Sequence, residues 1–374
     1  MDADLVRLRV IARFWDVELQ TSRQRDAAAQ LAEAMAAPEA VADAWNALPD
    51  DQRQALEPLL AAGGRMPLRV FAREWGEIRT MGPGRAEREQ PWQEPASPAE
   101  GLWYRGFISR AFDQEPEGTY EVVFVPPELQ AHLPIPSTPP PAITIESAPA
   151  PAGVRLAGDG LLDDACTLLA YLQNEQLRPG TDGNWPTRHE ARLAHRLRDP
   201  DPTRLAFLRH LVQRLGWLRH AAAQRGTDSG RLRPDPGPVA AWLQSPTGQQ
   251  RSVLAEAWRD DPTWNDLFHV PTLHPEDTGA WRNDPLLARK AILRYLTTIH
   301  REPVERRAPD TWYKLDDFVN AVKQTHPDFQ RPDGDYTTWY IRDATTSAYL
   351  SGFESWDRVE GALIHYLVTA PLAW

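Results

Sequence analysis

The sequence predicts a mainly helical protein with small β-hairpins, an α+β fold made of several modules. Apolar residues recur at helical spacing along much of the chain, whereas segments typical of strands are short and few. Residues 134–155 predict an extended linker, because seven prolines fall within residues 134–151 and exclude a helix there. We therefore expect helical modules on both sides of this linker.

Residues 1–45 predict a pair of helices ahead of the first module. Each helix has one apolar stripe, formed by Leu5, Leu8, Ile11, Ala12 and Trp15 in the first and by Ala28, Leu31, Ala32 and Met35 in the second. Thr21 or Ser22 can cap the second helix. Two helices this short need a neighbour, so we expect the pair to pack on the residues that follow.

Residues 46–133 predict three helices followed by a hairpin. The helices are expected to begin at Pro49, at Pro67 and at the capping box Ser97-Pro98-Ala99-Glu100, with a loop around Gly82-Pro83-Gly84 before the third. Strand-like segments follow at 107–112 and 120–125. This order is typical of the winged helix, an elaborated helix-turn-helix.

A similar order recurs after the linker and predicts tandem winged-helix modules with small β-wings. Residues 156–283 predict a winged-helix-like module with a helical extension: its helices are expected at 161–177, 187–198, 202–215, 238–244 and 247–260, with Thr187 as a cap and a wing between 226 and 237. Residues 284–374 predict a third module with helices at 285–299, 314–325 and 355–369. The third module lacks its wing, which indicates a fragment, a truncated paralogue, or a chain completed by a partner.

Composition and motifs argue against several classes of protein. The net charge of -11 argues against a polybasic nucleic-acid coat and against a membrane-surface binder. Cys166 is the single cysteine, which excludes an internal disulfide or a Cys-based zinc ribbon, and its apolar surroundings predict burial. The sequence has no phosphate-binding loop, no membrane-length apolar run and no secretory signal. We expect a cytoplasmic, non-catalytic protein without metal or cofactor.

The densest cationic region is residues 188–233, with eleven arginines against four acidic residues. Arg188, Arg192 and His195 recur at helical intervals, which places them on one stripe of the second helix of that module. Arg196 flanks this stripe, and leucines occupy the opposite side. The region therefore predicts a local basic face on an acidic protein.

The third helix of the same module is expected to turn Arg209, Gln213 and Arg214 toward solvent, because its apolar stripe faces inward. In a helix-turn-helix unit the third helix enters the major groove, and the second crosses the backbone. We therefore expect Arg188 and Arg192 to contact phosphates and the side chains of the third helix to lie nearest the base edges.

Other candidates are less specific. Arg105 and Arg110 bracket the junction between helix and wing in the first module, where nearby glutamates nearly cancel the positive charge. Four tryptophans cluster between the second and third modules, and core packing is favoured over a base-stacking platform or a partner pocket: Trp242, Trp258, Trp264 and Trp281. The basic face itself is also consistent with contact to an acidic protein surface or with plain solvation.

Several segments resemble a known family. Leu48-Pro49, Leu60 to Gly64, Leu102 to Ile108 and Val125 to Leu129 resemble the helicase-associated domain similar to the N-terminal region of XPB-type DNA-repair helicases. Trp356 to Glu360 and His365 to Leu372 resemble the helix of that domain that precedes a tryptophan-containing wing, and residues 5–35 resemble a SAP-like or Rho-N-like helical pair. The resemblance implies winged-helix modules associated with DNA transactions.

Two functions follow as hypotheses. The first is a non-catalytic accessory protein that binds nucleic acid, DNA in preference to RNA, and works with a helicase or a larger complex. The second is a protein-interaction adaptor that uses winged helices as docking surfaces. An enzyme would require a metal or nucleotide site for which the sequence has no motif.

Overall fold

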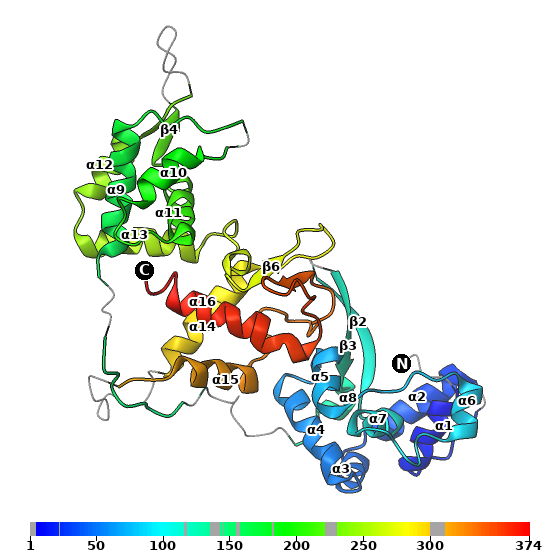
Figure 1. Ribbon diagram of the computed structural model, residues 1–374. Helices are drawn as coiled ribbons and strands as arrows, with labels where there is room; N and C mark the ends of the chain where they lie inside the picture. Colours follow the sequence, from blue (N-terminus) through cyan, green and yellow to red (C-terminus); the bar gives the residue numbers. More distant parts are fainter. Residues whose placement is uncertain are drawn as a thin grey trace. The chain divides into compact units, whose positions relative to one another are not determined.

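The computed structural model describes residues 5–21, 23–115, 118–134, 143, 145–154, 158–181, 183–220, 230–299 and 311–374 (Figure 1). The chain divides into two compact units: unit 1 comprises residues 1–142 and 331–335, and unit 2 comprises residues 143–330 and 336–374. The protein is mainly helical with small antiparallel sheets of two or three strands, which confirms the predicted α+β class. No helix in the described part of the chain combines the length and apolar character that crossing a bilayer requires.

Unit 1 begins with three helices where the periodicity predicted two. They are α1 (Leu5–Phe14), α2 (Gln24–Met35) and α3 (Pro38–Asn46). The predicted apolar stripes face inward, because Leu8 and Ile11 of α1 and Leu31 of α2 are fully buried. These side chains belong to the same apolar cluster as Leu56 and Phe107, so the N-terminal helices share the core of unit 1. Pro38 occupies the first position of α3, the helix that was not predicted. A backbone N–H at this position has no partner within the helix, so the proline costs no hydrogen bond.

The rest of unit 1 alternates short helices with a three-stranded sheet. In chain order its elements are α4 (Asp50–Ala61), β1 (Arg65–Pro67), α5 (Leu68–Trp75), α6 (Pro83–Glu89), α7 (Pro98–Tyr104), β2 (Ser109–Glu115), β3 (Gly118–Phe124) and α8 (Pro127–Gln130). The sheet is antiparallel with the strand order β1-β3-β2, and Arg65 pairs with Phe124. The predicted loop around Gly82-Pro83-Gly84 is the start of α6, because Pro83 again occupies the first helical turn.

The predicted capping box at α7 forms in part. Ser97 Oγ accepts a hydrogen bond from the Glu100 N–H at 3.0 Å, as expected of an N-cap serine. The Glu100 carboxylate, which is fully buried, accepts instead from the Ala96 N–H at 2.7 Å and from the Arg79 guanidinium at 2.6 Å. Glu100 therefore joins the start of α7 to the segment that follows α5.

Substitution of Gly106 is expected to destabilise unit 1. Gly106 follows α7 with φ +78°, and an added Cβ would lie 2.8 Å from Ile11 Cγ2. We expect Gly106→Ala to lower the free energy of unfolding by about 2 kcal/mol, since both the backbone conformation and the contact become unfavourable. Urea denaturation checks this, with Gly82→Ala as the control because a Cβ there meets nothing within 4 Å. Equal effects of the two substitutions would contradict the prediction.

Unit 2 opens with five helices and a short hairpin. The elements are α9 (Gly160–Asn174), α10 (Thr187–Ala194), α11 (Pro202–Arg214), β4 (Leu218–His220), β5 (Leu232–Pro234), α12 (Pro236–Leu243) and α13 (Thr247–Arg259). Thr187 was predicted to cap the second helix, but Pro186 is the N-cap residue and no side chain caps that end. The same helix ends at Ala194, four residues before the predicted end. Residues 221–229, which include the first four residues of the predicted wing, lie outside the described residues.

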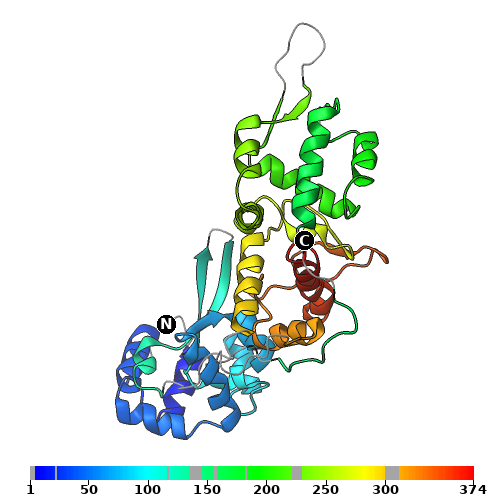
Figure 2. The same cartoon turned by 90° about the vertical axis from the view of Figure 1, so that its left-hand side faces the viewer.

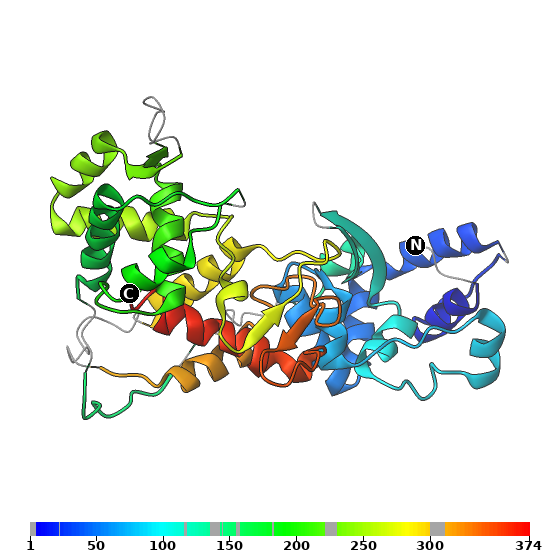
Figure 3. The ribbon, with the colours of Figure 1, turned by 45° about the horizontal axis from the view of Figure 1, so that its top comes forward.

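The remainder of unit 2 contains the three helices predicted at 285–299, 314–325 and 355–369, the last of them divided into a π-helical segment and an α-helix, together with short elements that the sequence did not predict. In chain order the elements are η1 (Asp266–His269), β6 (Leu273–Pro275), α14 (Pro285–Ile299), α15 (Leu315–Thr325), β7 (Ile341–Asp343), η3 (Phe353–Ser355), the π-helical η4 (Asp357–Gly361) and α16 (Ala362–Thr369). The strands β6 and β7 pair with each other, so residues of the second and third predicted modules share one sheet. Helix α16 lies beside α15 in Figures 2 and 3.

One apolar core runs through unit 2 from α9 to α16. All four tryptophans that cluster between the predicted second and third modules are buried in it, namely Trp242, Trp258, Trp264 and Trp281. The predicted core-packing role of these rings is therefore confirmed. Ten of the 22 residues of the predicted linker lie outside the described residues, namely 135–142, 144 and 155, and the division between the two units falls within the linker at residue 142.

Candidate nucleic-acid interface

Helix α10 presents the predicted basic stripe to solvent. Arg188, Arg192 and His195 are exposed, whereas Leu193 on the opposite side is fully buried. Within the described residues, no hydrogen bond or ion pair engages the guanidinium group of Arg188 or of Arg192. Both charges are therefore available to an anion from outside the unit.

A buried pair holds α10 against α9. Tyr171 Oη lies 2.8 Å from His189 Nδ1. Burial lowers the pKa of His189, and the adjacent positive charge of Arg188 lowers it further. The imidazole is therefore neutral near pH 7, so the contact between α9 and α10 adds no positive charge beneath the basic stripe.

Helix α11 is only partly available. Its apolar stripe faces the core as predicted, and Gln213 and Arg214 are exposed. Arg209 is half-buried: its Nη1 lies 3.1 Å from Glu190 Oε1, and its guanidinium lies over the Trp185 ring. The side of α11 that carries Arg214 faces Asp261, whose carboxylate lies 3.6 Å from Arg214 Nε.

Carboxylates from outside the cationic region neutralise much of its charge. The ion pairs are Arg196 with Glu175 at 3.7 Å, Arg198 with Asp163 at 2.6 Å, Arg204 with Asp164 at 2.7 Å and Arg214 with Asp261 at 3.6 Å. None of these four acidic residues falls within residues 188–233. The count along the sequence therefore overstates the charge that this surface offers to a ligand.

The hairpin adds two arginines whose positions only the strand register reveals. Arg219 of β4 and Arg233 of β5 are directly opposite each other. Arg219 is exposed, and Arg233 Nε is buried without a hydrogen-bond partner among the described residues. Like charges directly opposite each other on a hairpin are destabilising. A bound anion between them would relieve that repulsion.

Unit 1 uses its two candidate arginines internally. Arg105 is half-buried, donates to Gln52 Oε1 and lies over the Phe14 ring, and burial lowers its pKa. Arg110 lies over the Trp103 ring and 3.4 Å from Glu121. Most residues of α7 are buried as well, so this helix has no exposed face that could enter a DNA groove. We therefore leave Arg105 and Arg110 out of the interface proposed below.

The described residues contain no group of three or more histidine, cysteine, aspartate or glutamate side chains arranged to hold a metal ion. Cys166 is partly buried, and burial raises the pKa of its thiol, so it is a poor nucleophile near pH 7.

Comparison with family models, with curated proteins and with solved structures gives no match for this chain. The surface of unit 2 is therefore the basis of the function proposed below.

Proposed function

We propose that the protein binds nucleic acid, DNA in preference to RNA, as a non-catalytic accessory protein whose binding surface is formed by α10, α11 and the β4–β5 hairpin. The exposed and unpaired Arg188 and Arg192 are the observation that carries this proposal. Arginine side chains that recur along one helix face suit the spaced phosphates of a nucleic-acid backbone. Arg219 and Arg233 extend the same chemistry to the hairpin.

The order of elements supports a winged-helix architecture for this part of unit 2. The Leu177 carbonyl, just after α9, accepts a hydrogen bond of 2.9 Å from the Leu232 N–H of β5, and therefore occupies the place of a first strand beside the hairpin. Unit 1 has the same order in α4, β1, α5, α7 and the β2–β3 hairpin, with α6 inserted. Residues 285–374 differ, because β7 lies between α15 and α16. We therefore propose winged helices in two places and not in three.

The double variant Arg188→Ala/Arg192→Ala is expected to bind a labelled DNA duplex about tenfold more weakly at moderate salt. Two phosphate contacts would be lost, so the slope of log affinity against log salt should become shallower by about 2. Fluorescence anisotropy across a salt series measures both quantities. The same series with an RNA duplex tests the preference for DNA.

The matched control is Arg282→Ala/Lys290→Ala, which removes two positive charges from exposed positions elsewhere in unit 2. It should leave affinity and salt slope close to those of the wild type. Equal weakening by the two double variants would mean that α10 has no special part in binding.

A protein-interaction adaptor is the second candidate, and the hairpin of unit 1 favours it. Strand β2 is at the edge of its sheet, and its Phe112 is 71% exposed. An unpaired strand edge beside a large apolar side chain suits addition of a partner strand. The absence of any salt-dependent binding to DNA would favour this function over the first.

A further inference from the structure

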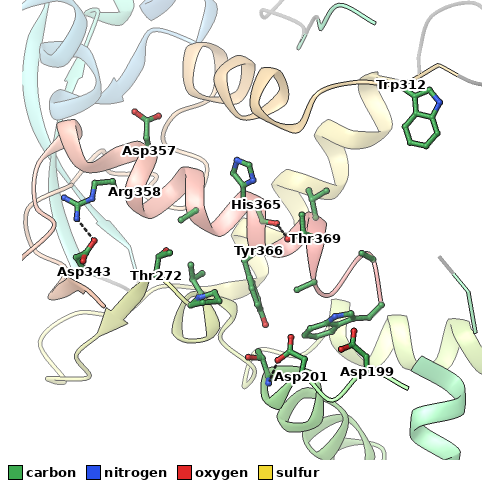
Figure 4. A pocket seen from close by; sticks show the side chains of 18 residues that line it. Asp199, Asp201, Thr272, Trp312, Asp343, Asp357, Arg358, His365, Tyr366 and Thr369 are labelled. Carbon is green, nitrogen blue, oxygen red and sulfur yellow. Dashed lines mark hydrogen bonds and ion pairs between the residues drawn. The ribbon is translucent and has the colours of Figure 1, made fainter. Parts of the chain in front are cut away.

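Unit 2 contains a cleft of about 1160 Å³ that extends along α16. Its walls come from α16, from the start of α11, from the loop at residues 270–272 and from Trp312 (Figure 4). Its volume is slightly above the range of about 300–1,000 Å³ that is typical of pockets that bind small organic molecules. The basic surface on α10 is not part of its lining, so the cleft is independent of the nucleic-acid proposal.

The hydroxyl group of Tyr366 is the feature of this cleft that most strongly indicates a ligand. Tyr366 is only 6% exposed, and its side chain extends across the cleft toward Asp201 (Figure 4). Its hydroxyl is buried without a hydrogen-bond partner among the residues that the structure describes. Buried polar groups are nearly always satisfied in native proteins, so this hydroxyl lacks a partner that a ligand could supply.

Two carboxylates line the end of the cleft that holds Tyr366. Asp199 and Asp201 both line it, and Asp201 also caps α11 by accepting from the Thr203 N–H at 2.7 Å. Burial raises the pKa of Tyr366, and the charges of Asp266 and Asp201 raise it further. The phenol is therefore protonated, and its surroundings disfavour an anionic ligand.

The charges at the opposite end are balanced within the protein. Asp343 pairs with Arg358, and Asp357 pairs with Lys323 at 2.6 Å. Asp199 also has a cationic partner, because Arg204 Nη1 lies 3.8 Å from its carboxylate. Among the described residues, no ion pair engages the Asp201 carboxylate at the end of the cleft that holds Tyr366.

An aromatic wall lies beside the same carboxylates. The Trp374 ring lines the cleft, with its centroid 6.5 Å from that of Tyr366 and 5.1 Å from that of Phe207. Tryptophan rings attract cations and also pack against the methylene groups that carry them. Carboxylates beside an aromatic ring and a free hydroxyl form a set that suits an ammonium group on an alkyl chain.

We propose that the cleft binds an alkylammonium ligand, with the ammonium group between the Tyr366 hydroxyl and the Asp201 carboxylate and the alkyl chain against Trp374. The hydroxyl accepts one N–H, and the carboxylate accepts another. Both a free polyamine and the lysine side chain of a partner peptide carry this chemistry, and the length of the cleft along α16 accommodates either.

Isothermal titration calorimetry of the full chain, free of nucleic acid, with spermidine and with a lysine-containing peptide tests the proposal. Asp201→Asn removes the charge but keeps a side chain that caps helices well, and we expect it to weaken binding about tenfold or more. Tyr366→Phe keeps the ring and should weaken binding about fivefold. Asp357→Asn, which removes the same charge at the opposite end of the cleft, should leave the affinity nearly unchanged.

The two probes distinguish the sources of the ammonium group. Tighter binding of spermidine assigns the cleft to free amines, and tighter binding of the peptide assigns it to a protein lysine. N-acetylated forms of both probes should not bind. No binding of either probe at millimolar concentration, or equal affinity for wild type, Asp201→Asn and Tyr366→Phe, would overturn the proposal.

Discussion

The variant Arg289→Met is expected to lower the free energy of unfolding of unit 2 by about 3–5 kcal/mol. Arg289 of α14 is 1% exposed, and its Nε lies 2.6 Å from Asp266 Oδ2. Its Nη1 donates to the carbonyls of Trp258 and Asp261, both at 2.6 Å, and its Nη2 donates to that of Trp264. Methionine would fill similar space but leave a buried carboxylate without its cation, which is among the most destabilising single changes.

The structure supplies both a control and a rescue for this prediction. Arg282→Met changes an exposed arginine in the segment before α14 and should alter stability by less than about 0.5 kcal/mol. Asp266→Asn combined with Arg289→Met leaves no buried charge, and the amide oxygen can still accept from the indole N–H groups of Trp258 and Trp264, both 3.1 Å from Asp266 Oδ1. We expect the double variant to be more stable than Arg289→Met in urea denaturation. A double variant of lower stability would show that the buried charge is not the cause.

Unit 2 is also expected to lose about 3 kcal/mol of stability between pH 7 and pH 4 through His269. Burial lowers the pKa of His269 from 6.5 to about 4, and the nearby His210 lowers it further. The unfolded chain therefore binds a proton below pH 6.5 that the folded protein does not bind. The stabilisation is fully present above pH 6.5 and is lost as the pH falls toward 4. Burial also lowers the pKa values of His189 and His326, which adds to the loss in the same direction.

The variant His269→Phe isolates this contribution. The imidazole is stacked on the Trp264 ring with a centroid distance of 3.7 Å, and phenylalanine can keep that stack without a titrating group. Urea denaturation at a series of pH values should show a shallower loss of stability for His269→Phe than for the wild type. Parallel curves for the two proteins would contradict the assignment to His269.

Helices with strong local signals were well predicted. The expected helices 285–299 and 247–260 correspond to α14 (Pro285–Ile299) and α13 (Thr247–Arg259). A proline at the first turn and apolar residues at regular spacing favour a helix through contacts between residues that are close in sequence. The sequence alone therefore indicates where such a helix begins and ends. Helix α10 was predicted too long, because the residues after Ala194 form tighter turns, in which the N–H groups of Arg196 and Leu197 each donate to the carbonyl three residues earlier.

The short strands were not predictable in this way. Strands β1, β6 and β7 each have three residues, which is too short for an alternating pattern to stand out. Each exists because a distant segment pairs with it, as Leu273 pairs with Asp343. The same is true of Arg219 and Arg233, whose opposition follows from the register of the hairpin and not from their spacing.

The sequence by itself determined the mainly helical class, the inward-facing leucines and the exposure of Arg188 and Arg192, because helical periodicity is a local property. Only the tertiary structure decided which arginines are available to a ligand. Arg214 meets Asp261, and Arg196 meets Glu175, across long stretches of chain. Coulombic interactions depend on distance in space, so charge summed along a segment cannot show which part of that charge is already neutralised.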